Sequence, residues 1–358
     1  MKKLIFTLCL AALTIAAAGQ KASELKYTDA RELMLINQGF DNTALPYSRL
    51  PEDHKEVTRK EVWDLGLNSA GLAVRFSTDS KAIGVRWKPL NGFAMNHMAA
   101  TGVRGIDLYY LNEKGVWSFI CTAIPRSTDC QSLLVSRMDG KVREYMAYLP
   151  LYDGVEYVEF GVDSTASITL PRKAALTKGA SKPIVFYGTS ITQGGCASRP
   201  GMVMTSIISR ALNKEVINLG FSGNARMDRS MVEALRRIDA DKIVIDCLPN
   251  CTLQIMKDSA YFFLTEVAKA HPSARIFMVE DYKYGYESVD LKTANDMAEK
   301  SAYWSDLYRK LRKEGYRNLR YVPREAVDEG DSEGTVDGTH RTDLGFYRMA
   351  QRYIPILH

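Results

Sequence analysis

The chain is poor in the residues that usually hold metal ions. Its 358 residues include five histidines and six cysteines, with no Cys-x-x-Cys pair and no paired-histidine spacing. Protein zinc sites are built from such closely spaced ligands. The sequence therefore predicts a protein that works without a metal and without another cofactor.

A stretch dominated by one sign of charge is also missing. The formal net charge is +5, and basic and acidic residues are interspersed along the chain. Proteins that follow a phosphate backbone carry a stripe of Lys and Arg. Nucleic acid is therefore excluded as an expected partner.

Long apolar runs are absent after residue 19, which argues against a membrane-spanning segment. The start of the chain is different: Lys2 and Lys3 precede the apolar run Leu4–Ala18, and Ala16–Gly19 offers small residues for cleavage. This is the pattern of a signal peptide over residues 1–19, with an uncleaved anchor as the alternative. We therefore expect an exported protein, either periplasmic or extracellular.

Export permits disulfides, but the number of cysteines after the leader is odd. Five cysteines follow the leader: Cys121, Cys130, Cys196, Cys247 and Cys251. An odd number leaves at least one unpaired or paired outside the chain. A Cys121–Cys130 bond would close a short loop, and Cys196 could lie near Cys251. The pairing stays open, with buried free thiols as the default.

What is present divides the chain into two halves. Residues 27–170 contain short segments of alternating polarity, typical of a β-sandwich. These segments are 73–77, 82–87, 106–110, 116–120 and 155–162, with a hairpin turn at 112–115 and one helical stretch near 29–36. Residues 165–181 are rich in small residues and predict a linker.

Residues 181–358 alternate between strand and helix, which predicts an α/β domain with a parallel sheet covered by helices on both faces. The expected strands are 183–187, 216–219, 242–246, 274–279 and 319–322. The expected helices are 202–212, 231–238, 261–270, 292–315 and 344–353. Sites in such sheets lie at the carboxyl ends of the strands.

A serine follows the first of these strands. The apolar run 184–187 ends at Gly188, and Ser190 comes directly after it. A serine hydroxyl needs a general base, and the base needs an orienting group. His340 and Asp337 supply both near the C-terminus, so the three residues predict a hydrolytic triad in the order Ser, Asp, His. The alternative is a turn serine, a turn aspartate and a solvent-facing histidine.

The spacing around Ser190 is not the Gly-x-Ser-x-Gly of the common α/β-hydrolase elbow. Instead, four blocks in chain order resemble the SGNH (GDSL-like) hydrolase superfamily. The blocks are Gly188-x-Ser190-x-Thr192-x-Gly194, residues 218–224, Leu248-Pro249-Asn250, and Asp337-Gly338-Thr339-His340. The resemblance implies a flavodoxin-like three-layer domain.

The same resemblance implies an oxyanion hole. It would consist of the backbone N–H groups of Ser190 and Gly223 and the side-chain amide of Asn250. The third block departs from the family, because Leu-Pro-Asn-Cys replaces the usual Gly-x-Asn-Asp. Asn250 is kept, but its loop must differ. Without the serine block, Asn250 would be taken as a turn residue and Gly223 as a source of positive φ.

The front half resembles the jelly-roll-like β-sandwich that precedes some bacterial SGNH domains, through Gly105-Ile106-Asp107-Leu108-Tyr109. Such two-domain proteins are similar to esterases that remove acetyl groups from polysaccharides. The expected function is hydrolysis of O-acetyl esters on an oligo- or polysaccharide through an acyl-enzyme. The alternatives are a lipase or thioesterase for longer acyl chains and a non-catalytic carbohydrate-binding protein.

Other residues of the front half allow two interpretations. Asn96 and His97 could reach across and line the active site as substrate-binding residues, or they belong to a plain surface loop. Asp107 and Tyr109 are expected to hold the sandwich together or to fix the interface between the halves. The three tryptophans Trp63, Trp87 and Trp117 could form a sugar-stacking face, but core positions are the more common case.

Overall fold

The structure is a computed structural model that describes residues 20–92, 94–171 and 181–358. The expected signal peptide and most of the expected linker lie outside the described residues. Within the described ranges, no helix has the length and apolar character needed to span a bilayer.

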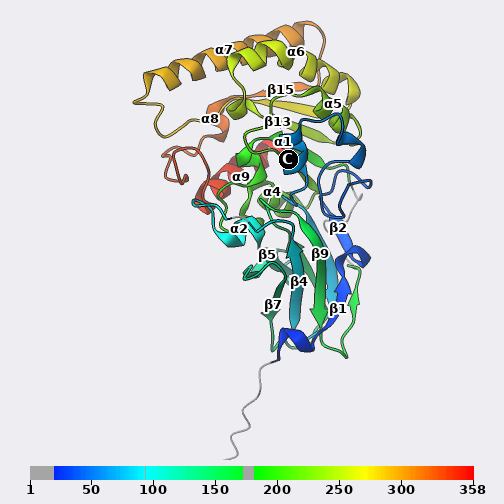
Figure 1. The fold of residues 1–358 in the computed structure, drawn as a ribbon. Helices are drawn as coiled ribbons and strands as arrows, with labels where there is room; N and C mark the ends of the chain where they lie inside the picture. The colour runs from blue at the N-terminus through cyan, green and yellow to red at the C-terminus, as the bar shows by residue number, and fades with distance from the viewer. Residues whose placement is uncertain (1–19, 93, 172–180) are drawn as a thin grey trace, which may run out of the picture.

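Residues 26–169 form two antiparallel sheets (Figure 1). The first has the order β1 (Lys26–Asp29), β9 (Val155–Val162), β4 (Ile83–Pro89) and β7 (Cys130–Val135). The second has the order β10 (Ile168–Thr169), β3 (Ala73–Thr78), β8 (Arg143–Tyr148), β5 (Ile106–Leu111) and β6 (Trp117–Ala123), and β2 (Met34–Ile36) also pairs with β3. Side chains of both sheets share one core, in which the rings of Phe76 and Phe160 lie 4.8 Å apart. The sandwich expected from the alternating segments is therefore present.

Three details of the front half differ from the sequence prediction. The helix expected near residues 29–36 is wrong, because the segment forms β1, a short 3-10 turn at Ala30–Glu32 and β2. Antiparallel pairing of β2 with β3 overrides the local helical spacing of its apolar residues. Two short helices, α1 (Lys60–Gly66) and α2 (Ala100–Arg104), were not expected and are too short to show a helical period. Strands β7 and β8 were not singled out either.

The tryptophans, the hairpin turn and the cysteines of the front half have defined positions in the structure. All three of the tryptophans in question, Trp63, Trp87 and Trp117, are buried, so the core interpretation is the correct one. The hairpin turn between β5 and β6 is present, with Gly115 at a φ of +74°. The five cysteines of the described residues are free thiols.

Residues 184–322 contain a five-stranded parallel sheet with the order β12-β11-β13-β14-β15. The strands are β11 (Ile184–Gly188), β12 (Val216–Gly220), β13 (Lys242–Asp246), β14 (Arg275–Val279) and β15 (Leu319–Val322). Numbered within this half, the order is 2-1-3-4-5, which is the flavodoxin-like arrangement. The connections leave β11 toward β12 on one side and continue through β13 on the other, so the switch point where such sheets bind ligands lies at the carboxyl ends of β11 and β13.

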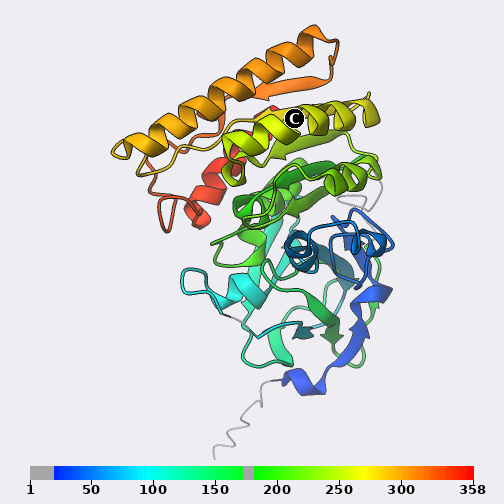
Figure 2. The same cartoon turned by 45° about the horizontal axis from the view of Figure 1, so that its top comes forward.

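Helices cover both faces of this sheet (Figures 1 and 2). One layer contains α4 (Met204–Leu212) and α9 (Asp343–Leu357), and the other contains α5 (Arg229–Arg236), α6 (Leu253–Ala270) and α7 (Leu291–Lys313). The short helices α3 (Ser190–Gln193) and α8 (Arg324–Val327) lie at strand ends. The three-layer α/β architecture expected from the sequence is therefore confirmed.

A buried carboxylate joins the two halves. Asp107 on β5 is fully buried, and its Oδ2 accepts hydrogen bonds from Arg199 Nη1 (2.7 Å) and from the Gly201 N–H (2.8 Å). Tyr109 adds its hydroxyl oxygen as a further acceptor for Arg199, at 2.6 Å. Asp107 Oδ1 also accepts a hydrogen bond from Thr122 Oγ1 of β6 at 2.7 Å. The carboxylate thus supports both expected roles, since it binds within the sandwich and across the interface between the halves.

Candidate active site

Ser190 is held at the junction between β11 and α3. Gly188 ends the strand, and a Cβ there would lie 2.0 Å from Thr192 Oγ1, so only glycine fits this turn. Thr189 caps α3 by accepting a hydrogen bond from the Ile191 N–H. Ser190 is therefore the first residue of a helix, with its side chain 7% exposed at the carboxyl edge of the sheet.

Ser190, His340 and Asp337 form one hydrogen-bonded chain. Ser190 Oγ lies 2.9 Å from His340 Nε2, and His340 Nδ1 lies 2.8 Å from Asp337 Oδ2. Asp337 Oδ1 accepts from the backbone N–H groups of Thr339 (3.0 Å) and His340 (2.7 Å). Partial burial raises the pKa of Asp337, but the hydrogen bonds from His340 outweigh it and hold the pKa at about 2. The carboxylate is thus ionised at neutral pH, where it can orient the imidazole.

The loop that carries Asp337 and His340 is closed on itself. Val336 donates its N–H to the His340 carbonyl at 2.8 Å, and Gly338 takes a φ of +84° at the tip. Arg341 forms an almost completely buried ion pair with Glu329. Helix α9 begins at Asp343, two residues later. The position of His340 is therefore fixed from both sides.

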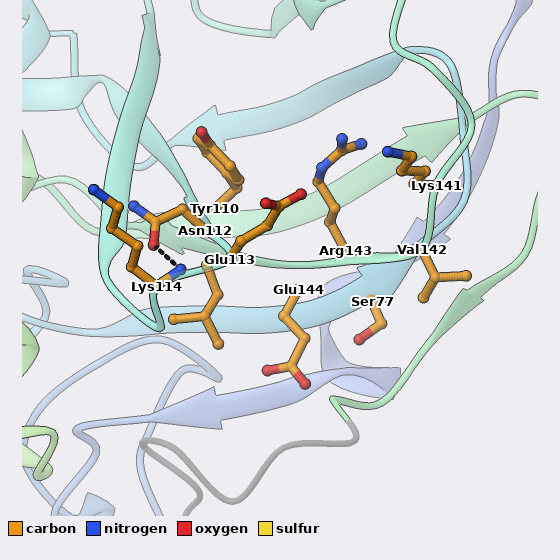
Figure 3. Close-up of a pocket in the computed structure, with 10 residues that line it drawn as sticks. Ser77, Tyr110, Asn112, Glu113, Lys114, Lys141, Val142, Arg143 and Glu144 are labelled. Atoms are coloured by element: carbon orange, nitrogen blue, oxygen red, sulfur yellow. Dashed lines mark hydrogen bonds between the residues drawn. The ribbon is translucent and has the colours of Figure 1, made fainter.

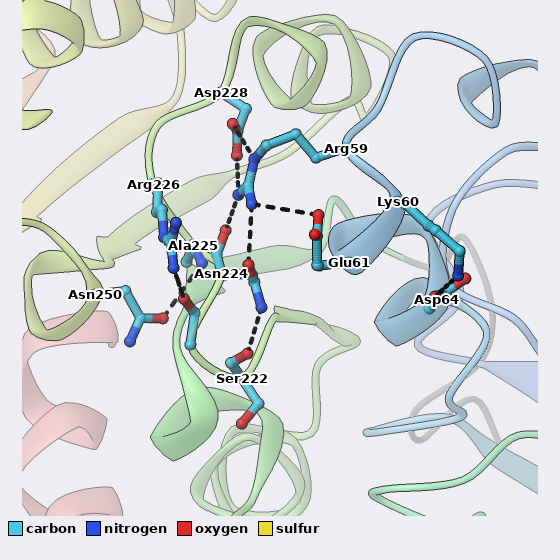
Figure 4. Close-up of polar contacts among 11 residues, drawn as sticks. Arg59, Lys60, Glu61, Asp64, Ser222, Asn224, Ala225, Arg226, Asp228 and Asn250 are labelled. Atoms are coloured by element: carbon cyan, nitrogen blue, oxygen red, sulfur yellow. Dashed lines mark hydrogen bonds and ion pairs between the residues drawn. The ribbon is translucent and has the colours of Figure 1, made fainter.

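Two of the three residues expected to form the oxyanion hole, Gly223 and Asn250, lie on two neighbouring loops. Gly223 follows β12 with a φ of +70°, and Asn250 follows β13. Asn250 Oδ1 accepts the Ala225 N–H at 3.3 Å, so its amide nitrogen lies on the opposite side of the side chain (Figure 4). The structure therefore brings the loops of Gly223 and Asn250 into contact at the carboxyl edge that also carries Ser190.

Arg59, which nothing in the sequence singles out, holds the Gly223 loop in place (Figure 4). Its guanidinium donates to both carboxylate oxygens of Asp228, at 2.8 and 3.0 Å. It also donates to the side-chain and backbone oxygens of Asn224, at 2.9 and 2.7 Å. The two partners flank the Ala225 N–H that Asn250 accepts. No spacing in a single sequence links residue 59 to residues 224 and 228.

Arg49, another residue of the front half, binds the end of the strand that leads into the same loop. It is 3% exposed, and its Nη1 donates to the carbonyls of Asn218 (3.0 Å) and Gly220 (2.7 Å) at the end of β12. Burial lowers the pKa of Arg49 to about 9, and the group still carries its charge at neutral pH. Arg49 therefore holds the end of β12, and Arg59 holds the loop that follows it and carries Gly223.

We expect Arg59→Gln to lower kcat on p-nitrophenyl acetate by about 10- to 100-fold, because small displacements of catalytic groups have effects of this size. KM should change less than kcat, since the resemblance to SGNH hydrolases implies that this loop holds an oxyanion donor, which acts on the transition state rather than on the ground state. Steady-state kinetics measures both. Arg237→Gln is the matched control: it removes a similar two-pronged pair, with Asp53, that joins the halves away from these loops. Equal losses in the two variants would mean that Arg59 contributes only to stability.

His97 of the front half lies directly beside His340. The two rings meet edge to face with their centroids 5.7 Å apart, and His97 Nδ1 lies 3.0 Å from Asn96 Oδ1. His97, which precedes α2, thus lies beside the loop that carries His340. The structure therefore places His97 beside His340, and binding of substrate by Asn96 or His97 stays a prediction.

Of two cavities in the described residues, one lies away from the predicted site and the other lies next to it. The largest one described, about 580 Å³, lies on the sandwich and is lined by residues of β5, β8 and the β5–β6 turn, such as Tyr110, Asn112 and Arg143 (Figure 3). It contains none of the predicted site residues, so volume alone does not locate the chemistry. A second cavity of about 370 Å³ is lined by both sequence neighbours of Asn250 and by Tyr284 and Tyr286.

Tyr286 connects the second cavity to the His340 loop. Its ring stacks on that of Tyr284, with centroids 5.7 Å apart and planes 14° apart. A Cβ placed on Gly338 would lie 3.1 Å from the Tyr286 ring, so ring and loop are in direct contact. Tyr286 is 41% exposed, which leaves part of its ring accessible. One wall of this cavity is therefore aromatic and adjacent to the Asp337–His340 loop.

Comparisons with known proteins agree with this architecture. The sequence profile of the GDSL-like lipase/acylhydrolase family matches residues 181–358, and the profile of the GxDLY N-terminal region of SGNH-hydro-type esterases matches residues 25–168. No curated protein matches the chain. A protein described as a GDSL-like lipase from Bacteroides ovatus is 32% identical over 93% of this chain and 97% of its own, with a TM-score of 0.87.

More distant structures share the fold. The salicylyl-acyltransferase SsfX3 of a tetracycline biosynthetic pathway has a TM-score of 0.70 at 15% identity, over 93% of this chain and 96% of its own. A family two carbohydrate esterase from Clostridium thermocellum has a TM-score of 0.60 at 14% identity, over 80% and 91% of the two chains.

A three-layer α/β domain with a serine, a histidine and an aspartate in contact at its carboxyl edge, preceded by a β-sandwich, defines a two-domain SGNH-type hydrolase. The chain belongs to the GDSL-like lipase/acylhydrolase family, in the form that carries a GxDLY N-terminal domain.

Proposed function

We propose that the protein is a serine esterase with Ser190 as nucleophile, and that residues 27–170 and 181–358 are its two domains. The observation that supports this most directly is the hydrogen-bonded chain from Ser190 through His340 to Asp337. The family assignment and the flavodoxin-like sheet point to the same chemistry.

In the proposed reaction, Ser190 Oγ attacks the ester carbonyl while His340 Nε2 takes its proton. The negative charge on the carbonyl oxygen is stabilised by the N–H groups of Ser190 and Gly223 and by the Asn250 amide. His340 then gives the proton to the leaving alcohol, and an acyl-Ser190 remains. Water attacks this ester, again losing a proton to His340. Collapse of the second intermediate releases the carboxylic acid and restores Ser190.

We further propose that the substrate is an acetyl ester on a carbohydrate and that the enzyme is exported. Two of the fold neighbours are family two carbohydrate esterases, from Clostridium thermocellum and Cellvibrio japonicus, which suggests this substrate class. The cavity beside Asn250 supports it, because an accessible tyrosine ring is a suitable surface for a sugar. The basic and apolar leader in the sequence supports export.

A panel of acetylated glycans, assayed for acetate release, tests this substrate class. A series of p-nitrophenyl esters of increasing chain length separates it from the lipase or thioesterase alternative. Preference for acetyl and release of acetate from glycans are the expected results. Preference for long acyl chains would replace the proposal by the lipase alternative. Glycan binding without hydrolysis of any ester would favour the non-catalytic alternative.

We expect Tyr286→Ala to lower the ratio of kcat/KM on glucose pentaacetate to kcat/KM on p-nitrophenyl acetate by about tenfold, or roughly 1.4 kcal/mol. The ratio corrects for any general loss of activity. Tyr286→Phe keeps the ring and should retain most of the ratio. Tyr261→Ala removes a comparably exposed tyrosine of α6 that is bonded to Glu314, and it should leave the ratio unchanged. An unaltered ratio in Tyr286→Ala would remove Tyr286 from sugar binding.

A further inference from the structure

Three side chains at the site form a set that the esterase mechanism does not need in full. His97, Asp337 and His340 each offer one ligand atom, and these atoms all lie within 4.8 Å of one another. In the ranges 20–92, 94–171 and 181–358, this is the one such trio of His, Cys, Asp or Glu side chains. The proposed mechanism uses Asp337 and His340 but gives His97 no chemical step. The position of His97 beside these two residues is therefore not explained by the esterase mechanism.

The chemistry of the trio matches that of a transition-metal site. Two imidazoles and one carboxylate are ligands that Zn²⁺ accepts, at distances of about 2.0–2.2 Å. A fourth position would be left for water, as in zinc sites with three protein ligands. The trio is partly exposed, so an ion from solvent can reach it. The sequence could not indicate it, because His97 lies 240 residues before Asp337 and on the other domain.

The surroundings of His97 favour this use of its ring. Asn96 Oδ1 lies 3.0 Å from His97 Nδ1, where it can accept the Nδ1 proton. The ring then exposes Nε2 as the nitrogen with a free lone pair. A hydrogen bond on one ring nitrogen is the usual arrangement around a metal-binding histidine, because it fixes the tautomer. The carboxylate of Asp337 is also oriented, because its Oδ1 accepts hydrogen bonds from the Thr339 and His340 N–H groups.

We propose that His97, Asp337 and His340 form an inhibitory site for Zn²⁺. A zinc ion on His340 Nδ1 displaces the proton shared with Asp337, and the neutral ring then carries its one proton on Nε2, by exchange with solvent, where no lone pair is left to take the Ser190 proton. A zinc ion on Nε2 occupies the lone pair that would take the Ser190 proton. In both cases His340 stops acting as a base. The metal is thus a reversible inhibitor of the triad, and one of its ligands, His97, comes from the sandwich domain.

The inhibition assay measures p-nitrophenyl acetate hydrolysis against increasing Zn²⁺, with every variant normalised to its own rate in EDTA. His97→Ala should raise the half-inhibitory concentration by about tenfold or more, because even indirect partners of a zinc ligand change affinity by 10–100-fold. His358→Ala, at the exposed C-terminus, should respond as the unmodified protein does. EDTA should restore activity, and Mg²⁺, which prefers oxygen ligands, should not inhibit. Equal sensitivity of His97→Ala and the unmodified protein would overturn the proposal.

The inhibitory part of this inference rests on the proposed esterase function, whereas the binding part does not. Calorimetric titration of Ser190→Ala with Zn²⁺ separates the two, since this variant keeps all three ligands. We expect one ion per chain, with binding weakened in Ser190→Ala/His97→Ala. Failure of the esterase function would leave this binding intact. Absence of zinc binding by Ser190→Ala would overturn the site whatever the enzyme hydrolyses.

Discussion

Replacing Ser190 with alanine is expected to lower kcat on p-nitrophenyl acetate by about 10⁴-fold or more. The variant loses the hydroxyl that forms the acyl-enzyme in the proposed mechanism, while its loops and His340 stay in place. Ser190 Oγ makes one hydrogen bond in the triad, to His340. The thermal midpoint of unfolding should therefore change little, which circular dichroism can measure.

The control for this experiment is Ser127→Ala, which removes a hydroxyl from an exposed turn of the sandwich. It should hydrolyse the ester at the unmodified rate. If Ser190→Ala also retained its turnover, the nucleophile would be another group and the proposed mechanism would be wrong. A large loss of thermal stability in Ser190→Ala would instead mean that the hydroxyl has a structural role.

The sequence was sufficient for the parts of the molecule that are encoded locally. The strand that ends at Gly188, the serine after it and the Asp337–His340 loop are each indicated by a few neighbouring residues. The alternation of strand and helix likewise predicted the parallel sheet, because period and length decide such elements. The helix expected near residues 29–36 failed because pairing with β3, more than 35 residues away, decides its structure.

The supports of the site could not be predicted, because they come from distant parts of the chain. Arg49 and Arg59 reach the Gly223 loop across more than 150 residues, and nothing in their own neighbourhood distinguishes them from surface arginines. His97 was named as a candidate only because its loop lies between two strands of the sandwich. Its contact with His340 depends on how the domains pack, which Asp107 and Arg199 fix at their interface.

Asp337→Asn is expected to lower kcat by about 10⁴-fold with little change in KM. Asparagine can keep the carbonyl oxygen that accepts the backbone N–H groups of Thr339 and His340, so the loop should hold its shape. Its amide nitrogen would then face His340 Nδ1 as a donor where the carboxylate was an acceptor. The imidazole would be forced into the tautomer with hydrogen on Nε2, which cannot take the Ser190 proton.

The size of this loss in kcat tells whether Asp337 acts by orienting the His340 ring or only by placing a negative charge nearby. Asp331→Asn is the matched control, because Asp331 lies six residues earlier in the same segment and pairs at the surface with Arg348. Both variants lose one negative charge near the site, and the control should keep kcat within about twofold. A loss confined to Asp337→Asn means that the hydrogen bond to His340 Nδ1, rather than the local field, sets the tautomer. If Asp337→Asn kept more than about a tenth of kcat, the imidazole would have to be oriented by another neighbour, and His97 is the ring in contact with it.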